Sequence, residues 1–268
     1  MQAQERHEAI LEVLLVEGRV EIAALRERLG VSEMTIRRDL AALERDGALR
    51  RVHGGASRVL SGSYEPPFAV RSRLHQGAKA AVAQLAGEQI SDGETLIVDG
   101  GSTGLALAAV LGGRVVTACP LSLRVANALS ASPTVRMLLP GGFVRPDEQS
   151  FVGEPVIRSL GDHVFDTYLM TISGATPAAG LTEWNSDDAA VKRAAMANAK
   201  RAILVCDSSK FGEAAFTKIA PLSAPGIVVT DTGLPQDVHS WLTDAGVTVL
   251  VADAAPLPPA SGSEPERA

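Results

Sequence analysis

From residue 79 onward, short apolar segments alternate with segments of helical periodicity, and this alternation strongly limits the possible folds. The apolar segments with the length and composition of buried strands are 95–98, 114–117, 135–139, 167–172, 202–206, 227–230 and 247–251. Helical patterns lie between most of them, at 78–90, 105–111, 121–129, 187–199 and 236–245. Strands that alternate with helices favour a mainly parallel sheet with helices on both faces. The sequence therefore predicts an α/β domain for this part of the chain.

The composition is that of a folded globular protein. Of the 268 residues, 46% are hydrophobic and 21% are charged, which excludes a wholly disordered chain. No run of about 18 apolar residues is present, so a membrane-spanning helix is not expected. Cys119 and Cys206 are the only cysteines, and the histidines are scattered, so we expect no disulfide framework and no metal site. The first residues lack the apolar segment of a signal peptide, and the sequence predicts a cytoplasmic protein without a cofactor or a membrane partner.

The charge is distributed unevenly along the chain. The formal net charge is −6, which is not typical of a nucleic-acid-binding protein. Residues 35–58, however, contain six arginines and three acidic residues, and the segments on both sides are acidic. A short basic stripe is sufficient to contact phosphates, because salt screens each charge beyond about 8–10 Å. The alternative is a solvated charged face, so the residue pattern has to decide between them.

The first part of the chain has the pattern of three short helices. A first helix is expected to end at Gly18, and a second covers 21–29. Gly30 then supplies a residue that tolerates a positive φ in the turn. Ser32 is a good N-cap for a third helix, which extends to about Asp46. A helix, a short glycine turn and a capped helix in this order predict a helix-turn-helix.

The third helix and the segment after it carry the basic residues. Paired arginines on the first turns of an exposed helix suit insertion into the major groove, where arginine binds guanine or phosphate with two hydrogen bonds. After Gly47, residues 48–59 predict a small β-hairpin, or wing, that turns at Gly54–Gly55. The expected base contacts are Ser32, Thr35, Arg37 and Arg38, and the expected phosphate contacts are Arg50, Arg51, His53 and Arg58.

The run VSEMTIRRDLAALERDGALRRVHGGA, residues 31–56, resembles the signature of the DeoR-family transcriptional regulators. The shared series is Val-Ser, Thr-Ile-Arg-Arg-Asp-Leu, Leu-Glu, Gly and Arg-Val-His-Gly-Gly-Ala, in this order. The resemblance implies a bacterial winged helix-turn-helix protein that represses genes of carbohydrate uptake or breakdown. The expected partners are double-stranded operator DNA and further copies of the chain, in a homodimer or homotetramer.

These patterns divide the chain into four parts. Residues 1–59 form the predicted winged helix-turn-helix domain, and residues 76–252 form the predicted α/β sensor domain. The segment 60–75 is interpreted as a linker because Pro66–Pro67 stiffens the chain and X-Pro bonds resist helix formation. Residues 253–268 are rich in Pro, Ser and Glu, and we expect a disordered tail.

The candidate ligand site is the loop that follows the first strand of the α/β domain. Ligands of parallel sheets bind beyond the carboxyl ends of the strands. In VDGGSTGLAL, residues 98–107, a strand leads through glycines and two hydroxyls into a helix. Amides at a helix N-terminus bind phosphate well, although a purely structural glycine turn is an equally common explanation. Dinucleotide-binding and Walker patterns are absent. Other strands end at 140–142, 173–174 and 207–210.

The DeoR resemblance continues through residues 79–231 and implies a sensor domain similar to sugar-phosphate isomerases and CoA transferases. By this resemblance the effector is a phosphorylated sugar, the glycine loop holds its phosphate, and Lys79, Asp207 and Lys210 take part in the response. One departure is TACP at 117–120, where relatives have Thr-Asn-Ser, so an asparagine is missing from the expected pocket. The expected effector-binding residues are Lys79, Asp99, Gly100, Gly101, Ser102, Thr103, Gly104, Gly141, Gly142, Ser173, Gly174, Asp207 and Lys210.

Two functions from different classes remain open. The first is a DNA-binding repressor that is not an enzyme and is controlled by a sugar phosphate. The alternative is a sugar-phosphate isomerase-like enzyme with an accessory N-terminal module, because fold alone does not decide function. An isomerase needs a positioned carboxylate base, and Asp99 or Asp207 could serve. The chain lacks the Lys-Gly-Gly-rich loop of similar ribose phosphate isomerases, which favours the regulator.

Overall fold

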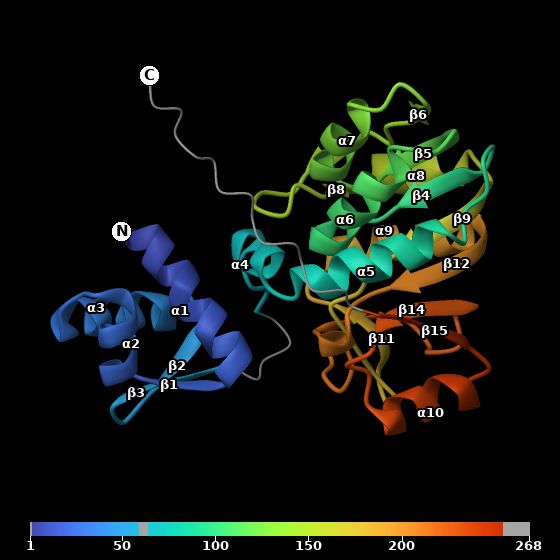
Figure 1. Ribbon diagram of the computed structural model, residues 1–268. Helices are drawn as coiled ribbons and strands as arrows, with labels where there is room; N and C mark the ends of the chain where they lie inside the picture. The colour runs from blue at the N-terminus through green and yellow to red at the C-terminus, as the bar shows by residue number, and fades with distance from the viewer. Residues whose placement is uncertain (1, 59–63, 254–268) are drawn as a thin grey trace, which may run out of the picture.

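A computed structural model describes residues 2–58 and 64–253 of the chain. It comprises a small N-terminal domain and a larger α/β domain, with the short helix α4 (Phe68–Arg73) between them (Figure 1). The fold class and the order of the two domains are those predicted from the sequence. Val59 and residues 60–63 of the expected wing and linker, and residues 254–268 of the expected tail, lie outside the described residues.

The N-terminal domain packs three helices against an antiparallel sheet of strand order β1-β3-β2. Gly18 and Gly30 end the first two helices with φ values of 71° and 65°, and Ser32 caps the third by accepting from the Thr35 amide at 3.2 Å. This confirms the predicted helix-turn-helix with a wing. The elements are α1 (Ala3–Glu17), β1 (Arg19–Glu21), α2 (Ile22–Leu29), α3 (Glu33–Arg45), β2 (Leu49–Val52) and β3 (Gly55–Arg58).

The strand β1 was not predicted, because three residues are too few to show a periodic pattern. It pairs with β3 and turns the expected two-stranded wing into a three-stranded sheet. A Cβ atom on Gly55 would lie only 2.0 Å from the carbonyl oxygen of Val20. The second glycine of the His-Gly-Gly-Ala series is therefore required by the close approach of β1, and not only by the hairpin turn.

The predicted linker contains a helix, which corrects the expectation drawn from its prolines. Pro67 is the N-cap residue of α4, with φ −52° and ψ 144°, so the proline precedes the helix and does not interrupt it. Val70 is fully buried in the same apolar cluster as the core of the N-terminal domain, and the half-buried Tyr64 and Leu74 pack against that cluster. The helix α4 also contacts α6 (Gly101–Leu111) of the larger domain. It is therefore a packed bridge between the two domains.

The larger domain is built on a seven-stranded parallel sheet of order β15-β14-β12-β9-β4-β5-β6. Each apolar segment predicted to be a strand coincides with one of these strands, with ends that shift by a few residues. Their bounds are β4 (Thr95–Val98), β5 (Val116–Pro120), β6 (Val135–Met137), β9 (Phe165–Met170), β12 (Ala199–Val205), β14 (Ile227–Asp231) and β15 (Thr248–Ala252).

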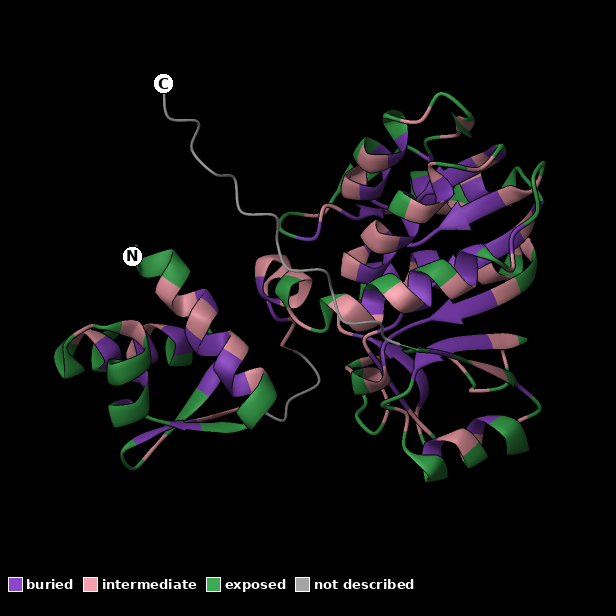
Figure 2. Ribbon diagram, viewed as in Figure 1, coloured by how far each residue is buried: buried purple, intermediate pink, exposed green. Residues whose placement is uncertain are grey.

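Helices cover both faces of the sheet, as predicted. One apolar cluster joins the sheet to α5, α6 and α7, and a second joins the other face to α8, α9 and α10. Figure 2 shows the strands buried beneath helices whose outer surfaces are exposed. The helices not yet given are α5 (Gln76–Gly87), α7 (Leu123–Ser130), α8 (Glu154–Gly161), α9 (Ser186–Ala197) and α10 (Gln236–Asp244).

Several short elements beside the sheet were not predicted from the sequence. A three-stranded antiparallel sheet has the order β10-β11-β13, and β7 pairs with β8. The helix α8 was also missed. The strands are β7 (Phe143–Val144), β8 (Phe151–Val152), β10 (Gly174–Thr176), β11 (Gly180–Glu183) and β13 (Thr217–Ala220), and the 3₁₀ turn η1 covers Ser208–Lys210. The turn η1 and the small sheet lie beyond the carboxyl ends of β9 and β12, where they enclose the candidate site.

Candidate functional site

The exposed side of α3 carries the residues predicted to contact bases. The Ser32 hydroxyl lies 2.9 Å from that of Thr35 at the start of the helix. Arg37 and Arg38 are exposed one turn further on, and Arg37 forms an ion pair of 2.7 Å with Glu33. An exposed pair of this kind contributes only about 0–1 kcal/mol, so Arg37 can leave Glu33 for another anion at little cost.

The opposite side of α3 is held against α1 by Asp39. The carboxylate is 4% exposed and accepts hydrogen bonds from the Arg6 guanidinium at 2.8 and 3.0 Å, and His7 lies 3.2 Å away. Burial raises the pKa of Asp39, but the contacts with Arg6 and His7 outweigh it and hold the pKa below its ordinary value. Asp39 therefore fixes the orientation of α3 and does not belong to its exposed face.

The wing presents three of its four predicted phosphate contacts to solvent. Arg50, Arg51 and His53 are exposed, and the backbone amide of Arg51 donates a hydrogen bond to the Glu44 carboxylate at 2.9 Å. Arg58, at the end of β3, is directed instead toward the larger domain. Its guanidinium forms an ion pair with Glu213, in the loop before β13.

The loop after β4 places Asp99 in a buried polar network. Its carboxylate, 3% exposed, accepts from the Tyr168 hydroxyl at 2.9 Å, from the Thr171 amide at 2.9 Å and from the Gly100 amide at 2.8 Å. The Lys192 ammonium lies 3.0 Å away. The sequence predicted Asp99 to bind the effector directly. In the structure Asp99 lines the small cavity, and its contacts tie the carboxyl ends of β4 and β9 together.

Lys192, on α9, is the cation at the centre of this network. It contacts Glu183 at 2.8 Å in addition to Asp99, and it donates to the Thr171 carbonyl at 2.8 Å. Burial lowers the pKa of Lys192, but the two carboxylates outweigh it and raise the pKa above its ordinary value. Lys192 is not among the effector-binding residues expected from the sequence. Its role depends on partners far away in the chain.

The glycines of the loop have different roles. The helix α6 begins at Gly101, which has φ +78° and adjoins a small cavity lined by residues 99–103. Gly104 lies in the first turn of α6, where a Cβ atom would come within 2.1 Å of the Asp99 carbonyl oxygen. Gly104 therefore allows close packing of the helix on the strand. Ser102 and Thr103 line the cavity with the backbone of Gly100 and Gly101.

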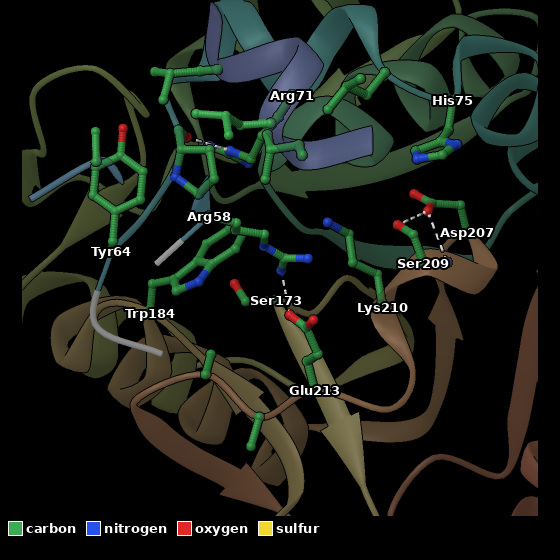
Figure 3. Close-up of a pocket in the computed structure, with 18 of the residues that line it drawn as sticks. Arg58, Tyr64, Arg71, His75, Ser173, Trp184, Asp207, Ser209, Lys210 and Glu213 are labelled. Carbon is green, nitrogen blue, oxygen red and sulfur yellow. Dashed lines mark hydrogen bonds and ion pairs between the residues drawn. The ribbon is translucent and has the colours of Figure 1, made fainter. Parts of the chain in front are cut away.

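A larger cavity of about 270 Å³ lies between the two domains. Lys79 of the predicted effector set lines it. Figure 3 shows Ser173, Asp207 and Lys210 of the same set around the cavity, together with Trp184. Its opposite wall comes from the N-terminal domain, from α4 and from the segment just before α4. The residues are Leu11, Leu14, Leu15, Ala48, Arg58, Tyr64, Pro66 and Arg71. The sequence predicted the residues of the sensor domain but not the contribution of the N-terminal domain.

The charged groups of the larger cavity affect one another. Burial lowers the pKa of Lys79 to about 8, although Asp207 opposes that change. Burial raises the pKa of Asp207, but Lys210, Ser209 and Lys79 outweigh it and leave the pKa below its ordinary value. Oδ1 of Asp207 accepts from the Ser209 amide at 3.2 Å, whereas Oδ2 is buried without a hydrogen-bond partner in the described structure. A buried carboxylate oxygen of this kind is suited to accept from a ligand hydroxyl.

Arg71 of α4 connects the two cavities, and it was missed because it lies in the expected linker. It lines both and forms ion pairs with Glu65 at 3.2 Å and with Glu148. Its guanidinium carbon lies 5.3 Å from the ring centroid of Trp184, and the Lys210 ammonium lies 5.5 Å from the same ring. Each of these two cations lies within about 6 Å of the ring, which is the range of a cation–π interaction.

The structure does not bring every predicted effector residue to these cavities. Gly141 and Gly142 are exposed in the turn before β7, and neither lines the two cavities. A Cβ atom on Gly174 would lie 2.3 Å from the Glu213 carbonyl oxygen, so Gly174 serves packing. Ala118, Cys119 and Pro120, where the expected asparagine is missing, are buried in β5 and line neither cavity.

Neither a membrane-spanning helix nor a metal-binding cluster is found among the described residues, 2–58 and 64–253. No helix there is both long and apolar enough to cross a membrane. Within the same ranges, no three His, Cys, Asp or Glu side chains are grouped in a way that could hold a metal ion.

Comparison with known proteins identifies both domains. Residues 6–61 match the model of the DeoR-like helix-turn-helix domain, and residues 74–232 match the model of the DeoR C terminal sensor domain. The Glycerol-3-phosphate regulon repressor of Escherichia coli (strain K12) is 33% identical over 245 residues, which cover 91% of this chain and 97% of that protein. The HTH-type transcriptional repressor CsqR of the same organism is 30% identical over 92% of this chain and 94% of its own length.

The similarity to a solved sugar-phosphate enzyme is distant. Ribose 5-phosphate isomerase A from Neisseria gonorrhoeae aligns with 50% of this chain and 53% of its own at 14% identity, with a TM-score of 0.39. This similarity is too low to support any conclusion about activity.

Proposed function

Because the chain belongs to the DeoR family of transcriptional regulators, we propose that it represses carbohydrate-metabolism genes and is controlled by a phosphorylated sugar bound in its C-terminal domain. The observation that carries this proposal is an exposed, Ser-capped helix bearing Arg37 and Arg38, joined by α4 to a domain whose cavities are lined by basic, acidic and hydroxyl side chains. The relatives named above as repressors match almost the whole chain, which supports the same function here.

The helix α3 enters the major groove and reads the operator. Ser32, Thr35, Arg37 and Arg38 contact bases, while Arg50, Arg51 and His53 hold the flanking phosphates. Arg58 joins these phosphate contacts when it leaves Glu213. Two subunits of a homodimer or homotetramer place their α3 helices in half-sites about 34 Å apart.

The effector binds at the carboxyl ends of β4, β9 and β12. Its phosphate accepts from the amides and hydroxyls of 101–103 at the start of α6, where the helix dipole favours an anion. Lys79, Ser173, Asp207 and Lys210 surround the rest of the molecule. The shape of the site depends on Asp99, Gly104 and Gly174, which do not contact the ligand in this proposal. The turn with Gly141 and Gly142 affects the site only by positioning β7 and β8.

Replacing Ser102 and Thr103 together by Ala should remove the effect of a sugar phosphate on operator binding and leave operator affinity itself unchanged. Both hydroxyls are proposed phosphate donors, and neither belongs to the N-terminal domain. Fluorescence anisotropy of labelled operator DNA, with and without the effector, measures both quantities. Ser240→Ala and Thr243→Ala on the remote helix α10 form the control pair. A full effector response in the 102/103 variant would place the phosphate elsewhere.

The same site is proposed to bind sugar phosphates without converting them. An isomerase base must approach a sugar carbon, and Asp99 is already engaged by Lys192, Tyr168 and two amides. We therefore expect the purified protein to leave ribose 5-phosphate, glucose 6-phosphate and fructose 6-phosphate unchanged over hours, as followed by NMR. Turnover at enzymatic rates that Asp207→Asn abolishes would instead favour the isomerase-like alternative.

A further inference from the structure

The larger cavity is enclosed by both domains, which gives it a direct connection to the DNA-binding wing. Asp207, Lys210 and Trp184 belong to the α/β domain, whereas Arg58 and Leu14 belong to the N-terminal domain. Figure 3 shows the Arg58 side chain extending across the cavity to Glu213. The cavity therefore exists in this form only while the wing lies against the sensor domain.

The lining of this cavity has the chemistry of a site for a small phosphorylated polyol. Oδ2 of Asp207 is buried with no hydrogen-bond partner in the described structure, so an acceptor is available for a ligand hydroxyl. The basic side chains Lys79 and Lys210 line the same cavity and favour an anionic ligand. The volume of about 270 Å³ suits one monosaccharide, because pockets for drug-sized ligands span about 300–1,000 Å³.

The larger cavity also adjoins the small cavity at the start of α6. Arg71, Ser173, Trp184 and Lys210 line both. A ligand with its phosphate at the first turn of α6 can therefore extend its hydroxylated carbons toward Asp207. No covalent step is involved, and the ligand needs only to span two adjoining spaces.

Arg58 is expected to contact a DNA phosphate, but it also closes the cavity by pairing with Glu213. It was predicted from the sequence to bind a DNA phosphate, and in the structure it is paired with Glu213. Its side chain is 34% exposed and that of Glu213 is 53% exposed, so the pair lies at the surface and can open. One guanidinium cannot serve both partners in these two positions.

We propose that the hydroxylated part of the effector lies in the cavity between the domains, and that its binding holds Arg58 on Glu213 and so withholds the wing from DNA. This inference rests on the proposed function, and it adds the residue pair through which the ligand acts: Arg58 and Glu213 link the occupied cavity to the wing. Coupling between two ligands is reciprocal, so operator DNA weakens effector binding by the same factor.

The first test uses Asp207→Asn, which replaces the free acceptor oxygen by an amide. Binding of inorganic phosphate and of ribose 5-phosphate, glucose 6-phosphate, fructose 6-phosphate and glycerol 3-phosphate is measured by calorimetry. The preferred sugar phosphate should bind the wild type at least tenfold more tightly than inorganic phosphate, and Asp207→Asn should remove most of this preference while inorganic phosphate binds as before. An unchanged preference would overturn the placement of the sugar.

The second test uses Glu213→Gln, an exposed position where loss of folding is not expected. Without effector, the variant should bind operator DNA about twofold to fivefold more tightly, because Arg58 is released. The weakening caused by the preferred sugar phosphate should fall at least threefold. The matched control is Glu154→Gln on α8, an exposed glutamate paired with Arg158, which should behave as the wild type in both measurements.

The outcomes separate the inference from the proposed function. If Glu213→Gln retains the full effector response, or if the sugar phosphate strengthens operator binding in the wild type, the inference is wrong and effector control stands. If the wild type binds operator DNA but no sugar phosphate changes its affinity, the proposed effector control fails, and the inference fails with it.

Discussion

Replacing Lys192 by Met is expected to lower the free energy of unfolding by about 3–5 kcal/mol, because it leaves two buried carboxylates without their counter-charge. The Lys192 side chain is 8% exposed and lies between Asp99 and Glu183, at 3.0 and 2.8 Å. Methionine fills a similar volume, so the loss reports mainly the charge. Urea denaturation followed by circular dichroism measures the change.

Lys200→Met is the matched control for this prediction. Lys200 also forms an ion pair, with Asp166 at 2.7 Å, but its side chain is 66% exposed. Removing an exposed pair costs about 0–1 kcal/mol. If Lys192→Met were no more destabilising than Lys200→Met, the buried network would not hold the ends of β4 and β9 in the way described.

Replacing Arg38 by Ala should raise the dissociation constant for the operator about 5- to 150-fold, which corresponds to the loss of one base contact of about 1–3 kcal/mol. Arg37→Ala should have an effect in the same range, because the exposed pair with Glu33 is weak. Both variants should also discriminate less between the operator and an unrelated duplex. Anisotropy titrations of both DNAs at fixed salt give the two affinities.

A change at the wing should have a different signature. Arg50→Ala should weaken binding to both duplexes alike and reduce the salt slope by about 0.9 per lost phosphate contact. Arg158→Ala on α8 removes one exposed positive charge far from the N-terminal domain and serves as the control.

The assignment of α3 as the recognition helix has its own contradicting outcome. It would be wrong if both Arg37→Ala and Arg38→Ala bound the operator with an affinity within a factor of two of the wild type.

The N-terminal domain could be predicted in detail because its signals are local. Gly30, Ser32 and the apolar stripe of α3 determine a turn, a cap and a buried face within a few residues of one another. The strand β1 was not predicted because it forms by pairing with residues far away in the sequence, as the close approach of Val20 to Gly55 shows. Local signals were misleading in the linker. The prolines there indicated a segment without a helix, but Val70 packs into the apolar cluster of the N-terminal domain, and the sequence nearby does not show this contact.

The sequence predicted that the sensor domain is a sheet with a site at one edge. It did not predict the roles of the individual residues at that site. The rule that ligands lie beyond parallel strands drew attention to Asp99 and Asp207, which follow β4 and β12 and line the two cavities. It did not reveal that Lys192 and Tyr168 engage Asp99, or that the Asp207 Oδ2 atom has no partner in the described structure. Those roles depend on side chains brought together from several elements. The part that Arg58 takes in the cavity depends on how the two domains meet.

The central claim is that a sugar phosphate in the C-terminal domain controls a DNA-binding N-terminal domain. Its most direct test is operator affinity at fixed salt, on a duplex selected from a random library, with and without each of a panel of sugar phosphates. We predict that at least one of them raises the dissociation constant at least tenfold in the wild type and leaves it unchanged in the Ser102→Ala, Thr103→Ala variant. Tight operator binding that no sugar phosphate alters would contradict the claim.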